Sequence, residues 1–278
     1  MGEEGAWYFG KVDSIAEEGR DLLENYSGVP AAQVIEHVVN IRDKAYKVFP
    51  WPCIGRVSFL NNKLAKMSYA SKILPKLNKG ATFLDAGCCF GQQLRYLNYY
   101  DHISPSRLYA FDYEPEFIGL GYDLFRDKPK FQGHMVGGDM LAPLSSPQNA
   151  DLEALSIQGA IDVISVASVL HGWDYDDQLK AAINLVAFSR PEPGSLITGD
   201  LLGSLKAGSY PLPSELGSHY RHNIESFKAF WKEVGERTET RWDVEATFVG
   251  SQAIKDNEKS KYVDQDTRMI QFCCEKLE

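Results

Sequence analysis

The sequence has no apolar run of the roughly 18 residues that a membrane span requires, and it has no excess of positive charge. Acidic residues outnumber Lys and Arg by 38 to 29, so the formal net charge is -9. Because phosphate contacts come mainly from clustered Lys and Arg, this balance argues against a nucleic-acid surface. Residues 1–10 lack the basic start and apolar middle of a signal peptide. We therefore expect a cytoplasmic protein that binds a small molecule and neither nucleic acid nor membrane.

Metal-binding and serine-hydrolase signatures are also missing. The chain has five cysteines, an odd number, and four of them form the adjacent pairs Cys88-Cys89 and Cys273-Cys274 instead of C-x-x-C spacings. A zinc site is not expected from this arrangement, and cysteines within apolar strings usually behave as small buried hydrophobes. No G-x-S-x-G occurs, so the sequence does not predict a hydrolase nucleophile elbow.

What the chain does have is an alternation of short apolar strings with stretches of helical periodicity. With 278 residues, 44% of them hydrophobic, it can bury one sizeable core without disulfides or metal. The alternation predicts a doubly wound α/β fold with a mostly parallel sheet. Strands are expected at 82–86, 107–111, 133–136, 162–166 and 195–199, and helices at 92–99, 116–125, 175–189 and 224–234.

Both ends of the chain differ from this pattern. Strand-like segments 242–249 and 269–274 flank a charged stretch, 255–266, that we expect to be exposed, and together they predict a closing antiparallel hairpin. We predict an N-terminal helical segment over 1–80 and a core over 81–278.

Within the N-terminal segment, 29–47 predicts one or two helices with an apolar stripe of Val34, Val38, Ile41 and Ala45. Such a stripe is usually intramolecular core, although it leaves a homodimer open. Segment 49–55 is too proline-rich for a helix or a central strand, and it either packs on the sheet or forms a lid over a pocket.

The segment 83–91, FLDAGCCFG, runs from a predicted strand through a glycine turn into a helix. Gly87 and Gly91 allow a tight turn with close approach of the backbone to a ligand. Cys89 stands where G-x-G-x-x-G has its middle glycine, and no Lys-Ser/Thr follows, so a pyrophosphate cradle is disfavoured. Asp85 either serves the ammonium of an amino-acid ligand or caps the turn.

Acidic residues also follow the next two predicted strands. Asp112 ends the second, where doubly wound folds hold ribose hydroxyls, and Glu114 is a close second candidate. Either could instead cap the helix that Pro115 opens. Asp139 follows the third strand and could accept from an adenine amino group while Met140 packs on the ring. Three acids at successive strand ends predict one ligand site at the carboxyl edge of the sheet.

The fourth strand leads into the segment 167–174, ASVLHGWD, at the same edge. His171 is the candidate catalytic base of this segment. A lone histidine is more often a hydrogen-bonded structural residue than a catalytic base, and both roles stay open here.

These motifs resemble those of class I methyltransferases, and more closely those of fungal secondary-metabolite methyltransferases such as the O-methyltransferases of meroterpenoid pathways. The stretches that carry the likeness are 41–45, 52–55, 83–92, 114–118, 121–127 and 171–178, and the double cysteine in the glycine turn is specific to this group. The resemblance implies a Rossmann-like fold and S-adenosylmethionine as cofactor.

The resemblance also implies roles for individual residues. Gly87, Cys88 and Gly91 would shape the cofactor turn, and Ser168 would lie on the cofactor side of the site. Asp112 with Tyr113 would hold the ribose, Asp139 with Met140 would frame the adenine, and 52–55 would belong to a lid over the cofactor. The chain departs from the family at 169–174, where relatives have more aromatic residues before the histidine, so the acceptor is left undetermined.

We therefore expect methyl transfer to a carboxylate or hydroxyl oxygen of a terpenoid or polyketide-type secondary metabolite, with Trp51 and Trp173 in the pocket wall. A carboxylate acceptor needs no base, whereas a phenol or enol would use His171. Two alternatives stay open: a cyclase or isomerase on the same fold that transfers no methyl group, and a non-catalytic binding protein.

Overall fold

A seven-stranded sheet organises the computed structural model, which describes residues 8–211, 217–250 and 263–278. The order is β3-β2-β1-β4-β5-β9-β8. The first five strands pair in parallel, and β9 pairs antiparallel with both β5 and β8. Their bounds are Phe83–Ala86 for β1, Leu108–Asp112 for β2, His134–Gly137 for β3, Val163–Ala167 for β4, Leu196–Ser204 for β5, Trp242–Val249 for β8 and Thr267–Lys276 for β9.

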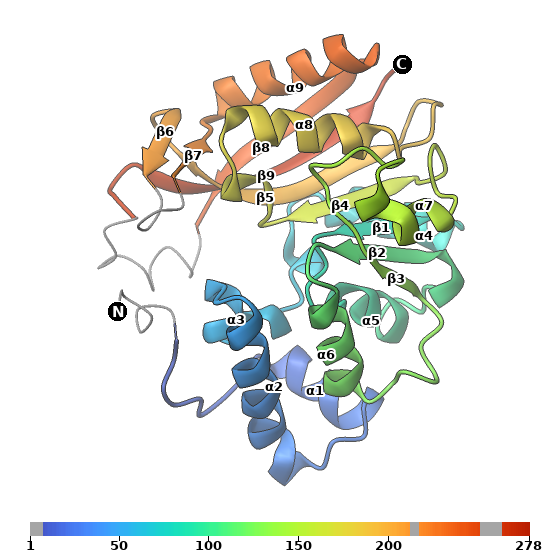
Figure 1. The fold of residues 1–278 in the computed structure, drawn as a ribbon, viewed down its shortest axis with the longest axis vertical. Helices are drawn as coiled ribbons and strands as arrows, with labels where there is room; N and C mark the ends of the chain where they lie inside the picture. Colours follow the sequence, from blue (N-terminus) through green and yellow to red (C-terminus); the bar gives the residue numbers. More distant parts are fainter. Residues whose placement is uncertain (1–7, 212–216, 251–262) are drawn as a thin grey trace.

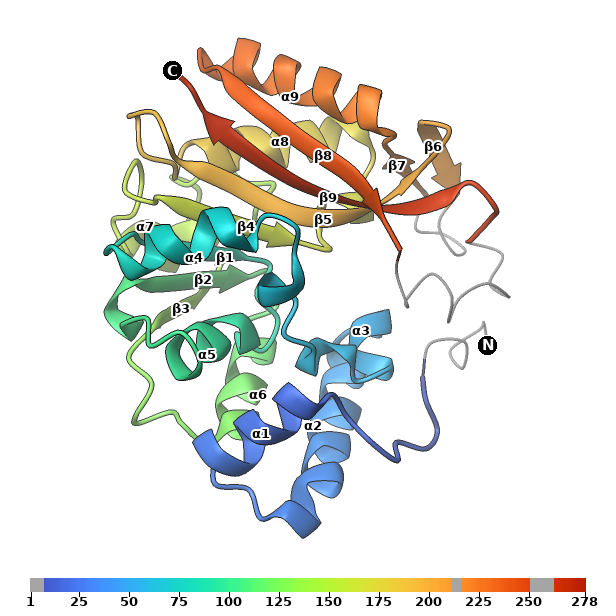
Figure 2. The ribbon, with the colours of Figure 1, turned by 180° about the vertical axis from the view of Figure 1, so that it is seen from behind.

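Helices cover both faces of this sheet, as the doubly wound prediction requires. Phe83 and Leu84 of β1 point to opposite faces and belong to separate hydrophobic clusters. One face carries α4 (Ala70–Asn78), α5 (Gln92–Tyr99) and α6 (Pro115–Phe125), and Figure 2 shows α4 and α5 in front of the strands. The other carries α7 (Ala150–Ala154), α8 (Tyr175–Val186) and α9 (Ile224–Thr238) (Figure 1).

The N-terminal segment forms an additional helical layer against α6 (Figure 1). It contains α1 (Glu17–Asp21), which continues as a π-helical turn, and α2 (Val34–Val48). The predicted stripe of Val34, Val38, Ile41 and Ala45 is buried in one cluster with α6 residues. It is therefore intramolecular core and offers no face to a second copy of the chain.

The prediction that 49–55 forms no helix is wrong, because Pro52–Gly55 is a helical turn, α3. Pro52 occupies its first turn, where the missing amide hydrogen has no intrahelical partner to lose. Helix α8 ends three residues earlier than predicted, at Val186, and α9 continues four residues further, to Thr238.

Strand β5 is longer than predicted because it pairs with β9 along its whole length, from Leu196 to Ser204. The predicted antiparallel hairpin of β8 and β9 is confirmed, with β9 placed between β5 and β8. The charged stretch 255–266 lies mostly outside the described residues. A small hairpin of β6 (Gly208–Pro211) and β7 (Ser218–Arg221) was not predicted. None of the described helices is long and apolar enough to cross a membrane.

A buried ion pair joins the N-terminal layer to the core. The guanidinium of Arg95, on α5, is fully buried and contacts both carboxylate oxygens of Asp127 at 2.9 Å. The Tyr26 hydroxyl donates to Asp127 Oδ2 at 2.7 Å, and Arg95 Nη1 donates to the carbonyl of Phe90 at 2.8 Å. The Arg95 guanidinium and its partner Asp127 thus connect the N-terminal layer, the segment after α6 and the glycine turn.

We predict that Asp127→Asn lowers the free energy of unfolding by about 3–5 kcal/mol, because it leaves a buried guanidinium without its counter-charge. Urea unfolding followed by circular dichroism measures this. Glu236→Gln is the matched control, since Glu236 pairs with Lys232 on the exposed surface of α9; we expect it to change the stability by less than about 0.5 kcal/mol. Equal effects of the two substitutions would contradict a special role for the buried pair.

Candidate functional site

The turn after β1 depends on its glycines for steric reasons. Gly87 and Gly91 have φ angles of +81° and +64°. A Cβ on Gly87 would lie 2.6 Å from a methyl of Val169, and one on Gly91 would lie 2.5 Å from the sulfur of Met135. Side chains therefore cannot be added at either position without displacing a neighbour. The buried Cys88 and the adjacent Cys89 occupy the turn between them.

Asp112 is placed at the end of β2 as predicted, and it also holds the glycine turn. Its Oδ2 accepts from the Cys89 amide at 2.7 Å, and its Oδ1 accepts from the Glu114 amide at 3.0 Å. Burial raises the pKa of Asp112, and these two amide donors oppose that effect. A carboxylate has about four lone-pair positions, so acceptor capacity remains.

The side chains of Tyr113 and Glu114, which follow Asp112, make fewer contacts around the turn. Glu114 is the first flanking residue of α6, but its side chain makes no cap hydrogen bond, so the capping alternative is not seen there. Tyr113 is 70% exposed.

Asp85 lies deep at the end of β1, with only 6% of its surface exposed. Burial, and then the negative charge of Asp112, raise the pKa of Asp85 to about 7, while the positive charge of Lys63 opposes the shift. The first residue flanking α5 is Gly91, and no side chain caps that helix. In the turn itself, the amides of Gly87 and Cys88 donate to the Phe111 carbonyl and that of Cys89 donates to Asp112, so other groups than Asp85 hold these donors.

Asp139 follows β3 and is braced by a residue that sequence reasoning missed. Asn149, 1% exposed, accepts from the Asp139 amide at 2.7 Å and donates to its carbonyl at 3.0 Å. The Asp139 carboxylate accepts from the Leu141 amide at 2.8 Å, and Met140 beside it is 7% exposed. These hydrogen bonds fix the backbone of Asp139 and Met140, the residues predicted to frame the adenine.

Beyond β4, a chain of hydrogen bonds crosses the sheet edge. Ser168 has a φ of 60° and donates from its hydroxyl to Asp200 Oδ1 at 2.8 Å, while Lys63 Nζ donates to the Ser168 hydroxyl at 3.0 Å. Sequence reasoning missed both Lys63 and Asp200. Asp200 directly follows the predicted strand 195–199, so the pattern that identified the other three acids could have found it. Nothing in the local sequence marks Lys63.

His171 lies in the short turn after Ser168, and its Nδ1 atom is buried without a hydrogen-bond partner. Burial lowers the pKa of His171 to about 4, although the charge of Asp200 opposes the shift. The imidazole is therefore neutral at physiological pH. Its backbone carbonyl accepts from His219 of β7 at 2.8 Å, which fixes the turn.

Trp51 and Trp173, the two tryptophans predicted to line the pocket wall, have different neighbours, and no ring contact between them is seen among the described residues. Trp51 is 44% exposed and its ring lies 4.3 Å from that of Phe49. Trp173 packs against the large cluster under α8 and α9, and its carbonyl accepts from the Tyr220 amide at 2.9 Å.

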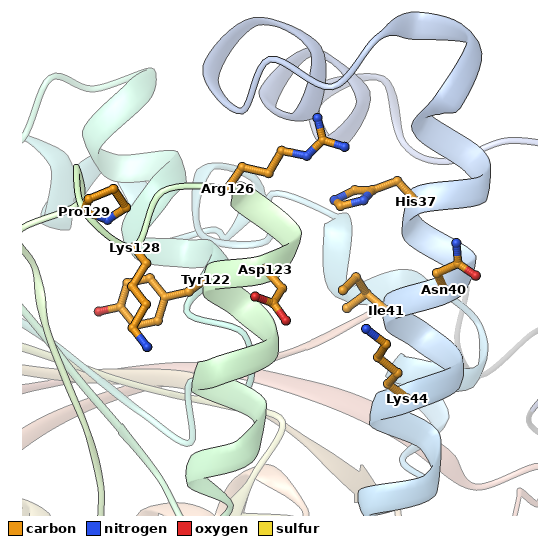
Figure 3. Close-up of a pocket in the computed structure, with 9 residues that line it drawn as sticks. All are labelled: His37, Asn40, Ile41, Lys44, Tyr122, Asp123, Arg126, Lys128 and Pro129. Atoms are coloured by element: carbon orange, nitrogen blue, oxygen red, sulfur yellow. The ribbon is translucent and has the colours of Figure 1, made fainter.

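The carboxyl edge thus gathers Asp85, the glycine turn, Asp112, Ser168 and His171, with Asp139 at the end of β3. A separate polar groove of about 520 Å³ lies between α2 and α6, where Lys44, Asp123 and Arg126 line it (Figure 3). None of the predicted site residues lines this groove.

Comparison with known proteins adds independent findings. Residues 7–60 match the family model of the meroterpenoid methyltransferase N-terminal domain. The chain is 38% identical to the O-methyltransferase phiE of a fungal species, over 86% of this chain and 78% of the relative. It is 36% identical to the O-methyltransferase atr3 of Stereocaulon alpinum, over 86% of this chain and 68% of the relative. The asnovolin E/chermesin D methyltransferase nvfJ of Aspergillus novofumigatus is 33% identical, over 89% and 86%.

Solved structures agree in fold. The 1,6-didemethyltoxoflavin-N1-methyltransferase of Burkholderia thailandensis, with 1,6-didemethyltoxoflavin and S-adenosylhomocysteine bound, superposes with a TM-score of 0.53 at 16% identity. The match covers 87% of this chain and 90% of that one. The Rossmann-like methyltransferase fold expected from the sequence is therefore confirmed.

We predict a pH-dependent stability difference between the protein and its Asp85→Asn variant. Because burial raises the pKa of Asp85 from 3.8 to about 7, the carboxyl group contributes stability at low pH that is lost as the pH rises through 7. Relative to the variant, the parent's free energy of unfolding should fall by about 2 kcal/mol between about pH 5.5 and about pH 8.5. Urea titrations of both proteins at the two pH values test this, and a pH-independent difference contradicts it.

Proposed function

Because this chain belongs to the fungal secondary-metabolite methyltransferases, we propose that it transfers a methyl group from S-adenosylmethionine to an oxygen of a terpenoid or polyketide-type metabolite. The observation that carries the proposal is the row of Asp85, Asp112 and Asp139 at three neighbouring strand ends beside a glycine turn. An amino-acid nucleoside needs acceptors for an ammonium, two ribose hydroxyls and an adenine amino group, and this row supplies them in that order.

The residues present fit the cofactor. Gly87 and Gly91 have no side chains, so the backbone of the turn can approach a ligand closely at these two positions. Asp112 retains lone pairs that can accept from the ribose hydroxyls. Asp139 and Met140 frame the adenine on the backbone that Asn149 holds rigid. Asp85 faces the ammonium, whose charge favours the ionised carboxylate. The bound cofactor supplies an electrophilic methyl group on a sulfonium.

The protein's own contribution is to orient the acceptor and to manage its proton. Holding a nucleophile in line with the methyl group is the main source of rate in such a displacement. His171 is neutral and lies in the turn after β4, and its Nδ1 has no protein hydrogen-bond partner. In the tautomer that carries its hydrogen on Nε2, Nδ1 would accept the proton of a phenol or enol. A carboxylate acceptor is already ionised and does not need it.

The N-terminal layer up to Leu60 serves in this proposal as a lid over the cofactor, whereas α4, also within the predicted segment 1–80, packs on the sheet. Phe59 lies 4.6 Å from Phe90 of the glycine turn in an edge contact, and the Tyr96 hydroxyl donates to the carbonyl of Leu60 at 2.5 Å. Cys53, on α3, packs in the same cluster as Cys89. These contacts support the proposed lid, because they pack the segment against the turn, where it would exclude water.

Cofactor binding tests the first step. Calorimetric titration of the protein with S-adenosylhomocysteine should show saturable binding, and Asp112→Ala should weaken it tenfold or more, because two hydroxyl acceptors and the support of the Cys89 amide are lost. Glu114→Ala is the matched comparison and should leave the affinity within about twofold. Absence of binding to the parent protein would contradict the proposal and favour a non-catalytic binding protein.

The acceptor class can be tested with His171→Asn. With methyl-labelled cofactor and a panel of terpenoid and polyketide acids and phenols, product mass should rise by one methyl group. We expect the variant to lose roughly 10²–10⁴-fold in kcat with a hydroxyl acceptor and to keep its kcat with a carboxylate acceptor. A rearranged product of unchanged mass would instead identify a cyclase or isomerase.

A further inference from the structure

Residues 61–66 connect the N-terminal layer to the core, and they run along the site. The Leu64 amide approaches Gln93 Oε1, at the start of α5, at 3.4 Å, and Lys63 Nζ donates to the Ser168 hydroxyl, after β4, at 3.0 Å. The segment therefore spans the carboxyl end of β1, from the helix that follows the glycine turn to the loop that carries His171.

The Lys63 ammonium carries a charge that no described carboxylate pairs within ion-pair distance. Its one described hydrogen bond is to a neutral hydroxyl, and an ammonium has three donors, so two remain. Lys66, three residues along the same segment, shows the contrast, because it pairs with Glu18 at 2.7 Å on the surface. The half-buried charge of Lys63 acts on Asp85, whose pKa it lowers against the effect of burial.

We propose that Lys63 binds the carboxylate of the cofactor's amino-acid end, while Asp85 receives its ammonium. The inference rests on the proposed function and deepens it. A zwitterion requires one cationic donor and one anionic acceptor close together, and Lys63 with Asp85 supplies that pair at the end of β1. If Asp112 binds the ribose, the amino-acid end extends from β2 toward β1 and β4, where Lys63 contacts Ser168.

The position of Lys63 in the N-terminal segment links cofactor binding to the proposed lid. The Lys63 ammonium lies on residues 61–66, the connection that follows the proposed lid. A ligand carboxylate bound to Lys63 would therefore hold this connection against the glycine turn. Binding of the cofactor and ordering of the covering segment would then depend on the same ion pair.

The test compares ligands that differ in the amino-acid end. The parent protein and Lys63→Met are titrated by calorimetry with S-adenosylhomocysteine and with 5′-methylthioadenosine, which lacks both the carboxylate and the ammonium. We expect Lys63→Met to weaken S-adenosylhomocysteine about ten- to hundredfold and to leave 5′-methylthioadenosine unchanged, as for loss of a charge-assisted hydrogen bond. Lys66→Met is the matched control and should bind both ligands as the parent does.

A second measurement uses the unaltered protein and so does not depend on the folding of a variant. Decarboxylated S-adenosylmethionine should bind the parent about ten- to hundredfold more weakly than S-adenosylmethionine, and in Lys63→Met the two should bind alike. Lys63→Arg, which keeps the charge, should restore most of the preference.

Three results would overturn the assignment. Equal loss of both ligands in Lys63→Met would show that Lys63 only supports the site's structure. An unchanged preference for the carboxylated cofactor would place the carboxylate elsewhere, and unchanged cofactor binding with weakened binding of an acidic acceptor would assign Lys63 to that acceptor. Failure of the parent to bind any of the four nucleosides would instead contradict the proposed function itself.

Discussion

The fully buried guanidinium of Arg95 holds together the parts of this molecule that meet at the site. It neutralises Asp127, and through Asp127 it reaches the Tyr26 hydroxyl of the N-terminal layer. The same group donates to the carbonyls of Phe90 and Gly91, which have left β1 and not yet entered the ladder of α5. The Arg95–Asp127 ion pair therefore links the glycine turn directly to the N-terminal layer. A cation at this depth is tolerable because carboxylate oxygens and carbonyls accept from all three of its nitrogens.

Much of the fold could be predicted from the sequence because its signals are local. Buried parallel strands are short apolar strings, and a proline such as Pro115 marks a helix start, so the positions of β1 to β4 and α6 followed directly. The acids at strand ends were equally accessible, because their meaning depends only on where a strand stops. Asp200 could have been found by the same pattern, because it directly follows the predicted strand 195–199. In the structure the strand does not end there, since β5 continues through Asp200 while paired with β9.

Residue roles that depend on contacts between distant segments of the chain could not be predicted from the sequence. Lys63 lies 105 positions from Ser168 in the chain, and no local pattern distinguishes it from Lys66. Asn149 resembles any loop amide until its bonds to Asp139 are seen. The protonation state of His171 could not be predicted either, because its low pKa comes from burial in the folded protein, in a turn that His219 of β7 fixes.

The position of β9 has a consequence for how the chain is made. Because β9 follows β8 in the sequence yet lies between β5 and β8, a growing chain emerging from the ribosome presents β5 as an open edge until residues 267–276 have been synthesised. An unpaired edge of nine residues, most of them buried in the finished sheet, is a template for pairing with other chains. Translation speed and chaperone access over the stretch after β5 therefore bear on the yield of folded protein.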